Sequence, residues 1–366
     1  MKHKETIKKL RECAKCLLEV AHDLQHSERM EPPRTLEIVE RQIKAKDGNA
    51  HGFCLPFVVG VDEFGDDVVL ELARLPHVLI GGATGQGKTM CLYSLIAGLV
   101  ATKTPDEVQF IVYDPKCVEY TGLADLPHLI MPPVTSVEKM VEAVHWLEAE
   151  VDKRLRMFAS VKCRNISQFN NREQEDEDAD ALPKTVPYIV AVLDDITDLM
   201  RNAGKEVEPI LCRITAIARA TGVHLVMATA RSDAKIVTSA IKANVPGRIA
   251  FMTASKADSM ALIEDKDAAN LPGSGNFILT EGFGELVRGQ GAFVTDEEIG
   301  WTRRIPTAEW LIGAAGGARG RPLRTQSVGS VAAEKIPAAA EKVAGEEKRR
   351  EQRRFLTESV RDGRGS

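Results

Sequence analysis

The stretch from Gly82 to Thr89 reads Gly-Ala-Thr-Gly-Gln-Gly-Lys-Thr and fits the phosphate-loop pattern G-x-x-x-x-G-K-[ST]. Its glycines let the backbone curl around an anion with N–H groups pointing inward. Lys88 can reach the β- and γ-phosphates of a nucleotide, and the Thr89 hydroxyl can bind Mg²⁺. We therefore expect ATP and Mg²⁺ as cofactors. The residues expected to contact the nucleotide are Gly82, Ala83, Thr84, Gly85, Gln86, Gly87, Lys88, Thr89 and Met90.

A second acidic element is needed to organise the metal and the attacking water. The stretch YIVAVLDDITDLM, residues 188–200, reads as a buried strand that ends in Asp194 and Asp195. The first carboxylate would hold the Mg²⁺ shell, and the second would orient or activate water. The alternative is a strand end that begins a turn with two aspartates. With the phosphate loop, the pattern predicts catalytic roles for Lys88, Asp194 and Asp195, and metal binding by Thr89 and Asp194.

The residues on either side of the loop indicate how it is positioned. An apolar run, 77–80, precedes it, and a helical pattern follows, which favours a nucleotide site over a structural glycine turn. Apolar strands alternate with helical segments along much of the chain, and this predicts an α/β fold with a mostly parallel sheet flanked by helices. The expected strands are 77–82, 108–114, 187–194, 223–229, 248–253 and 275–280.

Length and composition limit the class of protein. The 366 residues, 44% hydrophobic and 28% charged, suit a soluble protein of one large or two smaller domains. The sequence has no apolar run long enough to span a bilayer and no apolar stretch of a signal peptide, so we expect a cytoplasmic protein. Seven cysteines, an odd number, fit reduced thiols. The net charge of -5 means that any nucleic-acid surface must be local.

Composition divides the chain at about residues 50 and 312. Residues 1–50 read as a helix followed by a polar, possibly strand-bearing segment, and 51–312 as the main domain. The N-terminal helix carries an apolar seam that packs on its own domain or contacts a partner. Residues 313–366 read as a disordered linker and a basic tail that binds phosphate or a partner or only solubilises the chain.

Two further segments are predicted to have no chemistry of their own. The acidic stretch 171–185 reads as a mobile, solvated loop. Cys13 and Cys16 with His22 and His26 have a zinc-like composition. On one helix, at about 100° per residue, the histidines would point away from the cysteines, so we do not expect a zinc site.

Beyond the phosphate loop, several stretches in order along the chain resemble the motor domain of the FtsK/SpoIIIE family of DNA translocases. The resemblance covers about residues 55–298. The matching stretches are LARLPHVLIGGATGQGKT with its Pro76-His77 pair, FIVYDPKCVEY (110–120), LPHLIMPPVT (126–135), EVDKRLRMFASVKCRNISQFN (150–170), ARATGVHLVMATAR (218–231) and AIKANVPGRIAFMTASKADS (240–259).

The resemblance implies a RecA-like hexameric ring with ATP sites between subunits and duplex DNA in its pore. It matches Lys88, Thr89 and Asp194 to the family's P-loop pair and Mg²⁺-organising aspartate. It implies that Arg219, in ITAIARATG, is the catalytic arginine that reaches the neighbouring subunit's ATP. It further implies that three cations contact the DNA backbone, although each alone would read as a solvated surface residue. These are Arg231, Lys242 and Lys256.

The sequence departs from the family pattern at three positions. Asp195 stands where the family has glutamate, Ala230 replaces a polar residue that could sense the γ-phosphate, and Met260 replaces a pore arginine. Each departure bears on the coupling or the rate of hydrolysis. The sequence shows no counterpart of the family's N-terminal membrane region or C-terminal winged helix. We therefore expect a free motor that does not select DNA by sequence and that is recruited by the N-terminal helix or the tail.

Three functions from different classes follow from these patterns. The first is an ATP-driven double-stranded DNA translocase or packaging motor. The second is a nucleotide-gated DNA-binding ring or assembly factor with little ATP turnover, which the three departures motivate. The third is a P-loop enzyme acting on a small molecule, although the sequence has no signature of a lid or an acceptor pocket.

Overall fold

The computed structural model describes residues 32–45, 53–173, 182–233, 236–282, 286–295 and 297–299. The expected N-terminal helix, the cysteine–histidine set, most of the acidic loop and the C-terminal tail lie outside the described residues. The strands are β1 (Pro56–Asp62), β2 (Asp67–Glu71), β3 (His77–Gly81), β4 (Val108–Tyr113), β5 (Tyr188–Leu193), β6 (Val223–Thr229), β7 (Gly247–Phe251), β8 (Asn276–Thr280) and β9 (Val287–Gly291).

Helices lie between most of these strands. The α-helices are α2 (Thr35–Ala45), α3 (Lys88–Thr102), α4 (Val137–Ser160), α5 (Ile166–Asn170), α6 (Thr197–Ile217), α7 (Ser239–Asn244) and α8 (Lys256–Ile263). Short 3-10 turns cover Thr121–Leu123, Ala218–Thr221 and Asp267–Asn270. Within the described part of the chain, no helix is long and apolar enough to cross a membrane.

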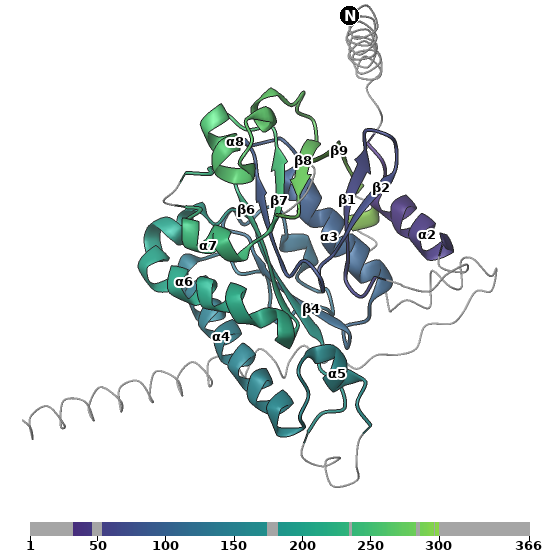
Figure 1. The fold of residues 1–366 in the computed structure, drawn as a ribbon, viewed down its shortest axis with the longest axis vertical. Helices are drawn as coiled ribbons and strands as arrows, with labels where there is room; N and C mark the ends of the chain where they lie inside the picture. The colour runs from purple at the N-terminus through teal and green to yellow at the C-terminus, as the bar shows by residue number, and fades with distance from the viewer. Residues whose placement is uncertain are drawn as a thin grey trace, which may run out of the picture.

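The strands form one sheet in the order β2-β1-β9-β8-β7-β3-β6-β5-β4 (Figure 1). Strands β7, β3, β6, β5 and β4 run parallel, which confirms the predicted parallel sheet with its helices. Each of the six predicted strands lies within two residues of its expected bounds. From β7 outward the sheet continues with antiparallel pairs through β8, β9, β1 and β2, so it is a mixed sheet.

Strands β1, β2 and β9 were not predicted. Strands β1 and β2 are joined by a tight turn, in which one Asp62 carboxylate oxygen accepts hydrogen bonds from the Phe64 and Asp66 N–H groups. Gly65 has the positive φ of 87° that such a turn favours. The sequence of β9, VRGQG, carries no strand signal, and its conformation depends on pairing with β8 and β1.

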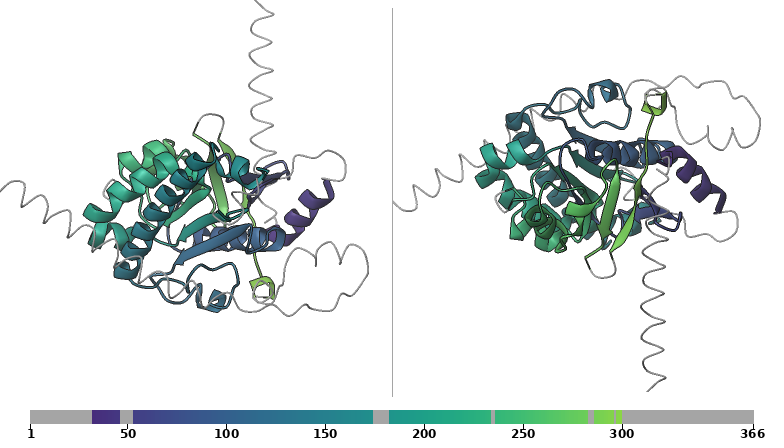
Figure 2. Two further views of the ribbon diagram at one scale, coloured as in Figure 1. Left: turned by 90° about the horizontal axis from the view of Figure 1, so that it is seen from below. Right: turned by 90° about the horizontal axis from the view of Figure 1, so that it is seen from above.

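Helices cover the two faces of the sheet separately. Helices α4, α6 and α7 lie on one face, whereas α3 lies on the other with α2 at its side (Figures 1 and 2). The alternation of side chains along β3 explains this arrangement. Val78 and Ile80 pack in the cluster with α3, and Leu79 packs in the cluster with α4 and α6. Because β3 is apolar on both faces, the phosphate loop that follows it is held between two cores.

Helix α2 corrects the prediction for the segment after Pro33. The sequence pattern indicated a polar, possibly strand-bearing connection there, but residues 35–45 are helical. Ile38 and Val39 are buried against β1 and α3, and the Thr35 hydroxyl donates to Ser94 Oγ at 2.8 Å. Packing on α3 thus selects the helix. The proposed domain boundaries at about residues 50 and 312 stay predictions.

Two buried histidines join β3 and β6 near the amino ends of these strands. In β3, His77 Nδ1 accepts from the Leu225 N–H at 3.0 Å, and in β6, His224 Nδ1 bonds to the Pro76 carbonyl at 3.0 Å. Both rings are fully buried. Burial lowers the pKa of His77 to about 3 and that of His224 to about 4. The fold therefore holds both imidazoles in the neutral form.

We predict that the folded domain loses stability in acid because of this pair. On unfolding, each imidazole regains its ordinary pKa, near 6.5, and takes up a proton, so the free energy of unfolding falls as the pH drops from about 6.5 towards 4. A shift of this size is worth about 3 kcal/mol for His224. Thermal unfolding at a series of pH values measures the loss.

The variant His224→Leu should show a shallower pH dependence over the same range, even if it is less stable at pH 7. The matched control is His145→Gln, at an exposed histidine of α4. An unchanged pH dependence in His224→Leu would contradict the assignment of the acid loss to this residue.

Candidate functional site

The phosphate loop, residues 82–87, connects β3 to α3 as predicted. Its three glycines have positive φ values: 149° at Gly82, 78° at Gly85 and 114° at Gly87. A Cβ at Gly82 would also lie 2.8 Å from the Cβ of Phe251, so a side chain there is excluded by contact as well as by conformation. Gly87 is the N-cap of α3. The loop thus has the shape that directs backbone N–H groups and the helix dipole at one anion.

Lys88 lies inside the loop, only 7% exposed. Its Nζ donates to the carbonyl oxygens of Gly82 at 2.8 Å and of Ala83 at 2.9 Å. Burial lowers the pKa of this amine, and the charge of Asp194 opposes the change. A cation held by two loop carbonyls is within a short side-chain rotation of an anion in the same loop.

Thr89 and Asp194 meet across the site. The Thr89 hydroxyl donates to Asp194 Oδ2 at 3.1 Å, and Asp194 is 2% exposed. Burial raises the pKa of this carboxyl, while the charge of Lys116 and the bond from Thr89 act against the rise. Its other oxygen, Oδ1, is buried and has no hydrogen-bond partner among the described residues. A hydroxyl and an unpartnered carboxylate oxygen form a donor set that fits Mg²⁺.

Asp195 follows Asp194 in a turn. Its φ of 73° is left-handed, and one carboxylate oxygen accepts from the Thr197 N–H at 3.1 Å at the start of α6. The structure thus places Asp195 beside Asp194, with part of its hydrogen-bonding capacity used by the turn. The predicted role in orienting water stays a prediction.

A shallow apolar hollow of about 190 Å³ adjoins the loop. Its lining includes Gly85, Gly87, Met90, Phe251 and Phe293. The predicted contact residue Met90 takes part in it, and its sulfur also accepts from the Val294 N–H at 3.3 Å. Sequence patterns did not indicate the contributions from β7 and β9, because those strands reach the loop only through the sheet order.

Lys116 is a basic residue of this site to which the sequence analysis gave no role. It lies in the loop after β4, where Asp114 accepts from the Lys116 and Tyr120 N–H groups at 3.2 and 3.0 Å. The Tyr120 ring packs 5.0 Å from the Tyr93 ring of α3. This loop therefore lies close to the start of α3, and the charge of Lys116 lowers the pKa values of both Lys88 and Asp194. The sequence feature that could have indicated this role was the tripeptide Asp114-Pro115-Lys116, which directly follows β4.

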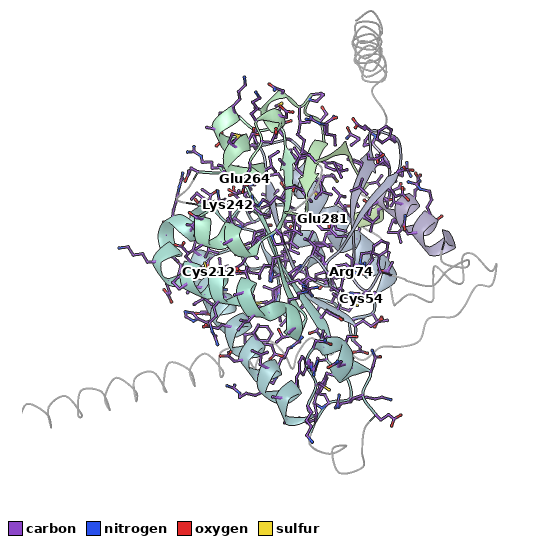
Figure 3. The ribbon with its side chains drawn as sticks, in the orientation of Figure 1. Cys54, Arg74, Cys212, Lys242, Glu264 and Glu281 are labelled. Atoms are coloured by element: carbon purple, nitrogen blue, oxygen red, sulfur yellow. The ribbon has the colours of Figure 1, made fainter. Side chains whose placement is uncertain are left out.

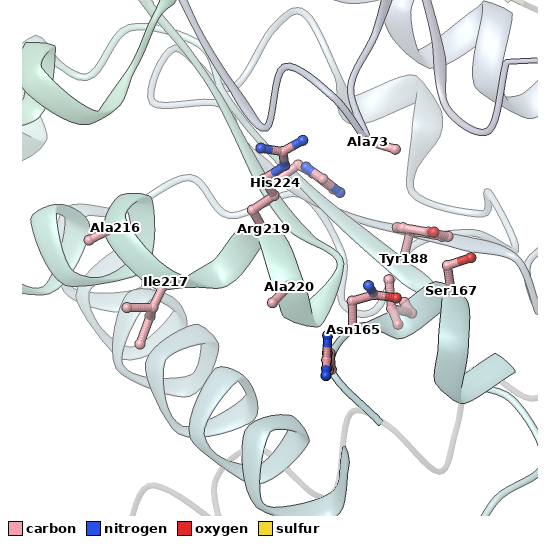
Figure 4. Close-up of a pocket in the computed structure, with 11 residues that line it drawn as sticks. Ala73, Asn165, Ser167, Tyr188, Ala216, Ile217, Arg219, Ala220 and His224 are labelled. Carbon is pink, nitrogen blue, oxygen red and sulfur yellow. The ribbon is translucent and has the colours of Figure 1, made fainter. Parts of the chain in front are cut away.

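Arg219 does not join this cluster. It lies in the 3-10 turn just before β6, and therefore at the opposite end of the parallel strands from the loop and Asp194. The seven residues of β6 alone separate the two ends by roughly 20 Å. The exposed side chain of Arg219 lines a hollow of about 480 Å³ together with Tyr188 and His224 (Figure 4).

The three predicted DNA-contacting cations differ in their surroundings. Arg231 follows the carboxyl end of β6, and Lys256 begins α8 after β7, and both side chains are exposed. Lys242 is half-buried, and its Nζ donates to the Ala261 carbonyl at 3.0 Å. It lies next to Glu264 at the end of α8 (Figure 3). Lys242 therefore fastens α7 to α8, whereas the other two extend into solvent.

The sheet, the loop and the buried acid at the end of β5 define a RecA-like P-loop ATPase fold. The family model for the FtsK/SpoIIIE family matches residues 38–234, and the chain belongs to this family. Over 246 residues it is 40% identical to DNA translocase FtsK of Leptospira interrogans, which covers 67% of this chain and 26% of the relative. Over 264 residues it is 37% identical to DNA translocase FtsK of Haemophilus influenzae, covering 67% and 50%.

These relatives are longer proteins, of which the chain spans between about a quarter and a half. Among solved structures, the fold is similar to that of the pCW3 conjugation coupling protein TcpA, with a TM-score of 0.59 and 24% identity over 74% of this chain and 73% of that one. It is also similar to the Type VII secretion ATPase EccC of Thermomonospora curvata, with a TM-score of 0.57 and 24% identity over 66% and 29%.

We predict that Lys88 and Thr89 contribute separately to nucleotide binding. Saturating ATPγS with Mg²⁺ should raise the Tm of the wild-type protein, since a ligand at 100 times its Kd adds about 2.7 kcal/mol. Lys88→Ala should abolish the rise with or without Mg²⁺. Thr89→Val should keep only the Mg²⁺-independent part, because it removes the hydroxyl and leaves the loop intact. The control is Lys205→Ala, at an exposed lysine of α6, and a full rise in Lys88→Ala would contradict the assignment.

Proposed function

We propose that the chain is the motor of an ATP-driven double-stranded DNA translocase, working as a hexameric ring with DNA in its pore. The observation that carries the proposal is the separation of two half-sites on one sheet. Lys88, Thr89 and Asp194 gather at the carboxyl end of the parallel strands, and Arg219 lies at the amino end. One copy of the chain therefore holds the phosphate-binding half, and in this proposal the arginine acts on the nucleotide of another copy.

In this proposal the loop N–H groups and Lys88 bind the β- and γ-phosphates. Thr89 and Asp194 hold Mg²⁺, which supplies charge neutralisation when it is bound. The hollow beside Met90 receives the base. Asp195 orients water, and its side chain is one methylene shorter than the family's glutamate. Because a misplacement of about 1 Å can cost on the order of 10²-fold in rate, we expect slow but real hydrolysis.

Arg219 completes the site in trans. An arginine that reaches the nucleotide of a neighbouring subunit can contribute about 10³–10⁵ in turnover. The buried side chain of Arg154 holds the turn that carries Arg219. Its Nη1 donates to the carbonyls of Pro187 at 2.7 Å and Thr221 at 3.0 Å. A fixed position is what such a role requires, because the two subunits must meet in one register.

DNA binding is assigned to the exposed cations at the carboxyl edge of the sheet. The side chains of Arg231 and Lys256 have no hydrogen bond or ion pair among the described residues, so their charges are available to phosphates. Repeated around a ring, a few such cations form a local basic channel in a protein of net charge -5. Lys242, the third cation of the proposal, lies near the amino end of β7, where Arg248 Nη2 donates to its carbonyl at 3.3 Å, and it also holds α8.

A second function is supported by Asp195 and by the two departures at Ala230 and Met260. In this alternative the ring binds DNA under nucleotide control, or assists assembly, with little ATP turnover. Met260 is 49% exposed on α8, where the family resemblance implies an arginine. For both functions the proposal places the ring in the cytoplasm, where ATP is supplied. Partners that recruit it would bind the predicted N-terminal helix or the predicted tail.

Steady-state ATPase activity with and without duplex DNA distinguishes these functions. We expect DNA to stimulate turnover, and Asp195→Asn to remove the stimulated activity because an amide cannot accept the proton of the attacking water. Nucleotide binding should survive in that variant. Tight DNA binding with negligible turnover would support the alternative ring, and turnover indifferent to DNA would contradict both. Wild-type rates in Asp195→Asn would show that another group activates the water.

We predict that Lys256 contacts phosphates and not bases. Lys256→Ala should weaken binding equally for unrelated duplex sequences. It should also lower the slope of log affinity against log salt by roughly one unit for each phosphate that the complex no longer neutralises. Lys205→Ala is again the matched control. A weakening that depends on DNA sequence, or an unaltered slope, would refute the phosphate contact.

A further inference from the structure

The hollow at the amino end of β6 carries two arginines and no acid. Arg164, from the connection between α4 and α5, and Arg219, from the turn before β6, both line it. Neither guanidinium has a hydrogen bond or an ion pair among the described residues, and the lining contains no aspartate or glutamate. Two unpaired cations in one hollow of about 480 Å³ make a site for an anion.

The floor of the hollow is formed by two stacked rings. The imidazole of His224 is fully buried, and its Nε2 has no hydrogen-bond partner in the part of the chain that the structure describes. The Tyr188 ring stacks against it with the centroids 5.9 Å apart, and both line the hollow (Figure 4). Because the neutral ring donates from Nδ1 to the Pro76 carbonyl, Nε2 is an acceptor, so an anion in the hollow is bound by the two guanidinium groups and not by the imidazole.

The two turns that carry the arginines are locked to each other. Gly222 has a φ of 72°, and a Cβ there would lie 2.4 Å from Ile166 Cδ1, so the absence of a side chain lets the Arg164 turn pack directly on the Arg219 turn. Gln168 and Asn165 fix the first turn, because the Arg164 N–H donates to Gln168 Oε1 at 2.8 Å and the Gln168 N–H donates to Asn165 Oδ1 at 2.9 Å. The spacing of the two cations is therefore set by packing.

The occupant cannot be the nucleotide of the same copy. Its phosphate loop lies at the other end of the strands, roughly 20 Å away along β6. A second copy of the chain carries the matching anion, a nucleotide triphosphate in a loop whose outer residues Thr84 and Gly85 are exposed. Arg219 is already assigned to that anion, and Arg164 shares its hollow.

We propose that Arg164 is a second trans-acting catalytic arginine, which binds the terminal phosphate of the ATP held by a neighbouring copy. The proposal rests on the function proposed above and adds a residue to it. Two guanidinium groups can donate hydrogen bonds to different oxygens of one phosphoryl group. The negative charge that develops on that group is then stabilised from two directions. Removing one preorganised donor of this kind typically costs about 10²–10³-fold in turnover.

The test uses the full chain and its DNA-stimulated ATPase activity. Arg164→Ala should lower kcat by about 10²-fold and keep the Tm rise given by ATPγS, because the phosphate loop of each copy is intact. Arg164→Lys should retain more activity than Arg164→Ala, since it keeps the charge. The matched control is Arg156→Ala, at an exposed arginine of the nearby α4 that does not line the hollow, and it should match the wild type. Because the Arg164 guanidinium has no partner among the described residues, the Tm of the nucleotide-free variant should be unchanged.

Mixed rings distinguish an action in trans from an action in cis. Arg164→Ala and Lys88→Ala subunits, each almost inactive alone, should regain activity when co-assembled, because some interfaces then pair an intact loop with an intact arginine. A parallel mixture of Arg219→Ala and Lys88→Ala should do the same. Recovery in the Arg219 mixture alone, or near-wild-type activity of Arg164→Ala, overturns the role of Arg164 and leaves the proposed function standing. Recovery in neither mixture overturns both.

Discussion

The hydrogen bond from Thr89 to Asp194 joins two segments that lie 105 residues apart, and the architecture of the site depends on it. It can form only if β3 and β5 end at the same edge of the sheet, with β6 between them. The parallel pairing of these strands supplies that alignment, and their full burial fixes it, since a shift of register would change the packing of both cores. The local chemistry thus follows from the sheet order.

Burial shapes the electrostatics of the same cluster. A carboxylate that is 2% exposed is costly unless cations or donors compensate it, and Lys88, Lys116 and Thr89 do so only in part, because the pKa of Asp194 remains raised. The remaining unsatisfied oxygen is the feature that favours a metal ion. Cations and anions in this site therefore depend on one another, and each of them is held by a different strand end or loop.

The opposite end of the sheet has the complementary character. There the exposed arginines of two turns stay unpaired, whereas buried or half-buried arginines among the described residues have partners, such as Arg154 with Glu150 and Arg248 with Glu264. Leaving two guanidinium groups without a carboxylate costs an isolated copy little, because ion pairs at an exposed surface contribute little stability. The same charges become useful where a neighbouring copy presents phosphate. In the proposed ring, the two ends would complete one ATP site between neighbouring subunits.

How far the sequence alone determined this protein differs from element to element. Local patterns were sufficient for the phosphate loop, for Asp194 at a strand end and for the parallel strands, because these features depend on neighbours in sequence: glycines before a helix, and continuous apolar runs buried on both faces. The family resemblance was also carried by contiguous motifs. The helix at 35–45 was misread because its apolar residues, Ile38 and Val39, gain their meaning only from contact with α3 and β1.

Other features were decided by tertiary structure. Strand β9 has no strand-forming residue run and exists because two neighbours pair with it. Lys116 acts on Asp194 only because its loop is drawn onto α3, and Lys242 is engaged by a carbonyl 19 residues away. Arg164 and Arg219 come together because Gly222, which has no side chain, leaves room for the side chain of Ile166. Long-range packing of this kind produces no periodic pattern in the sequence. The sequence therefore gives the types of these residues but does not show which of them come into contact.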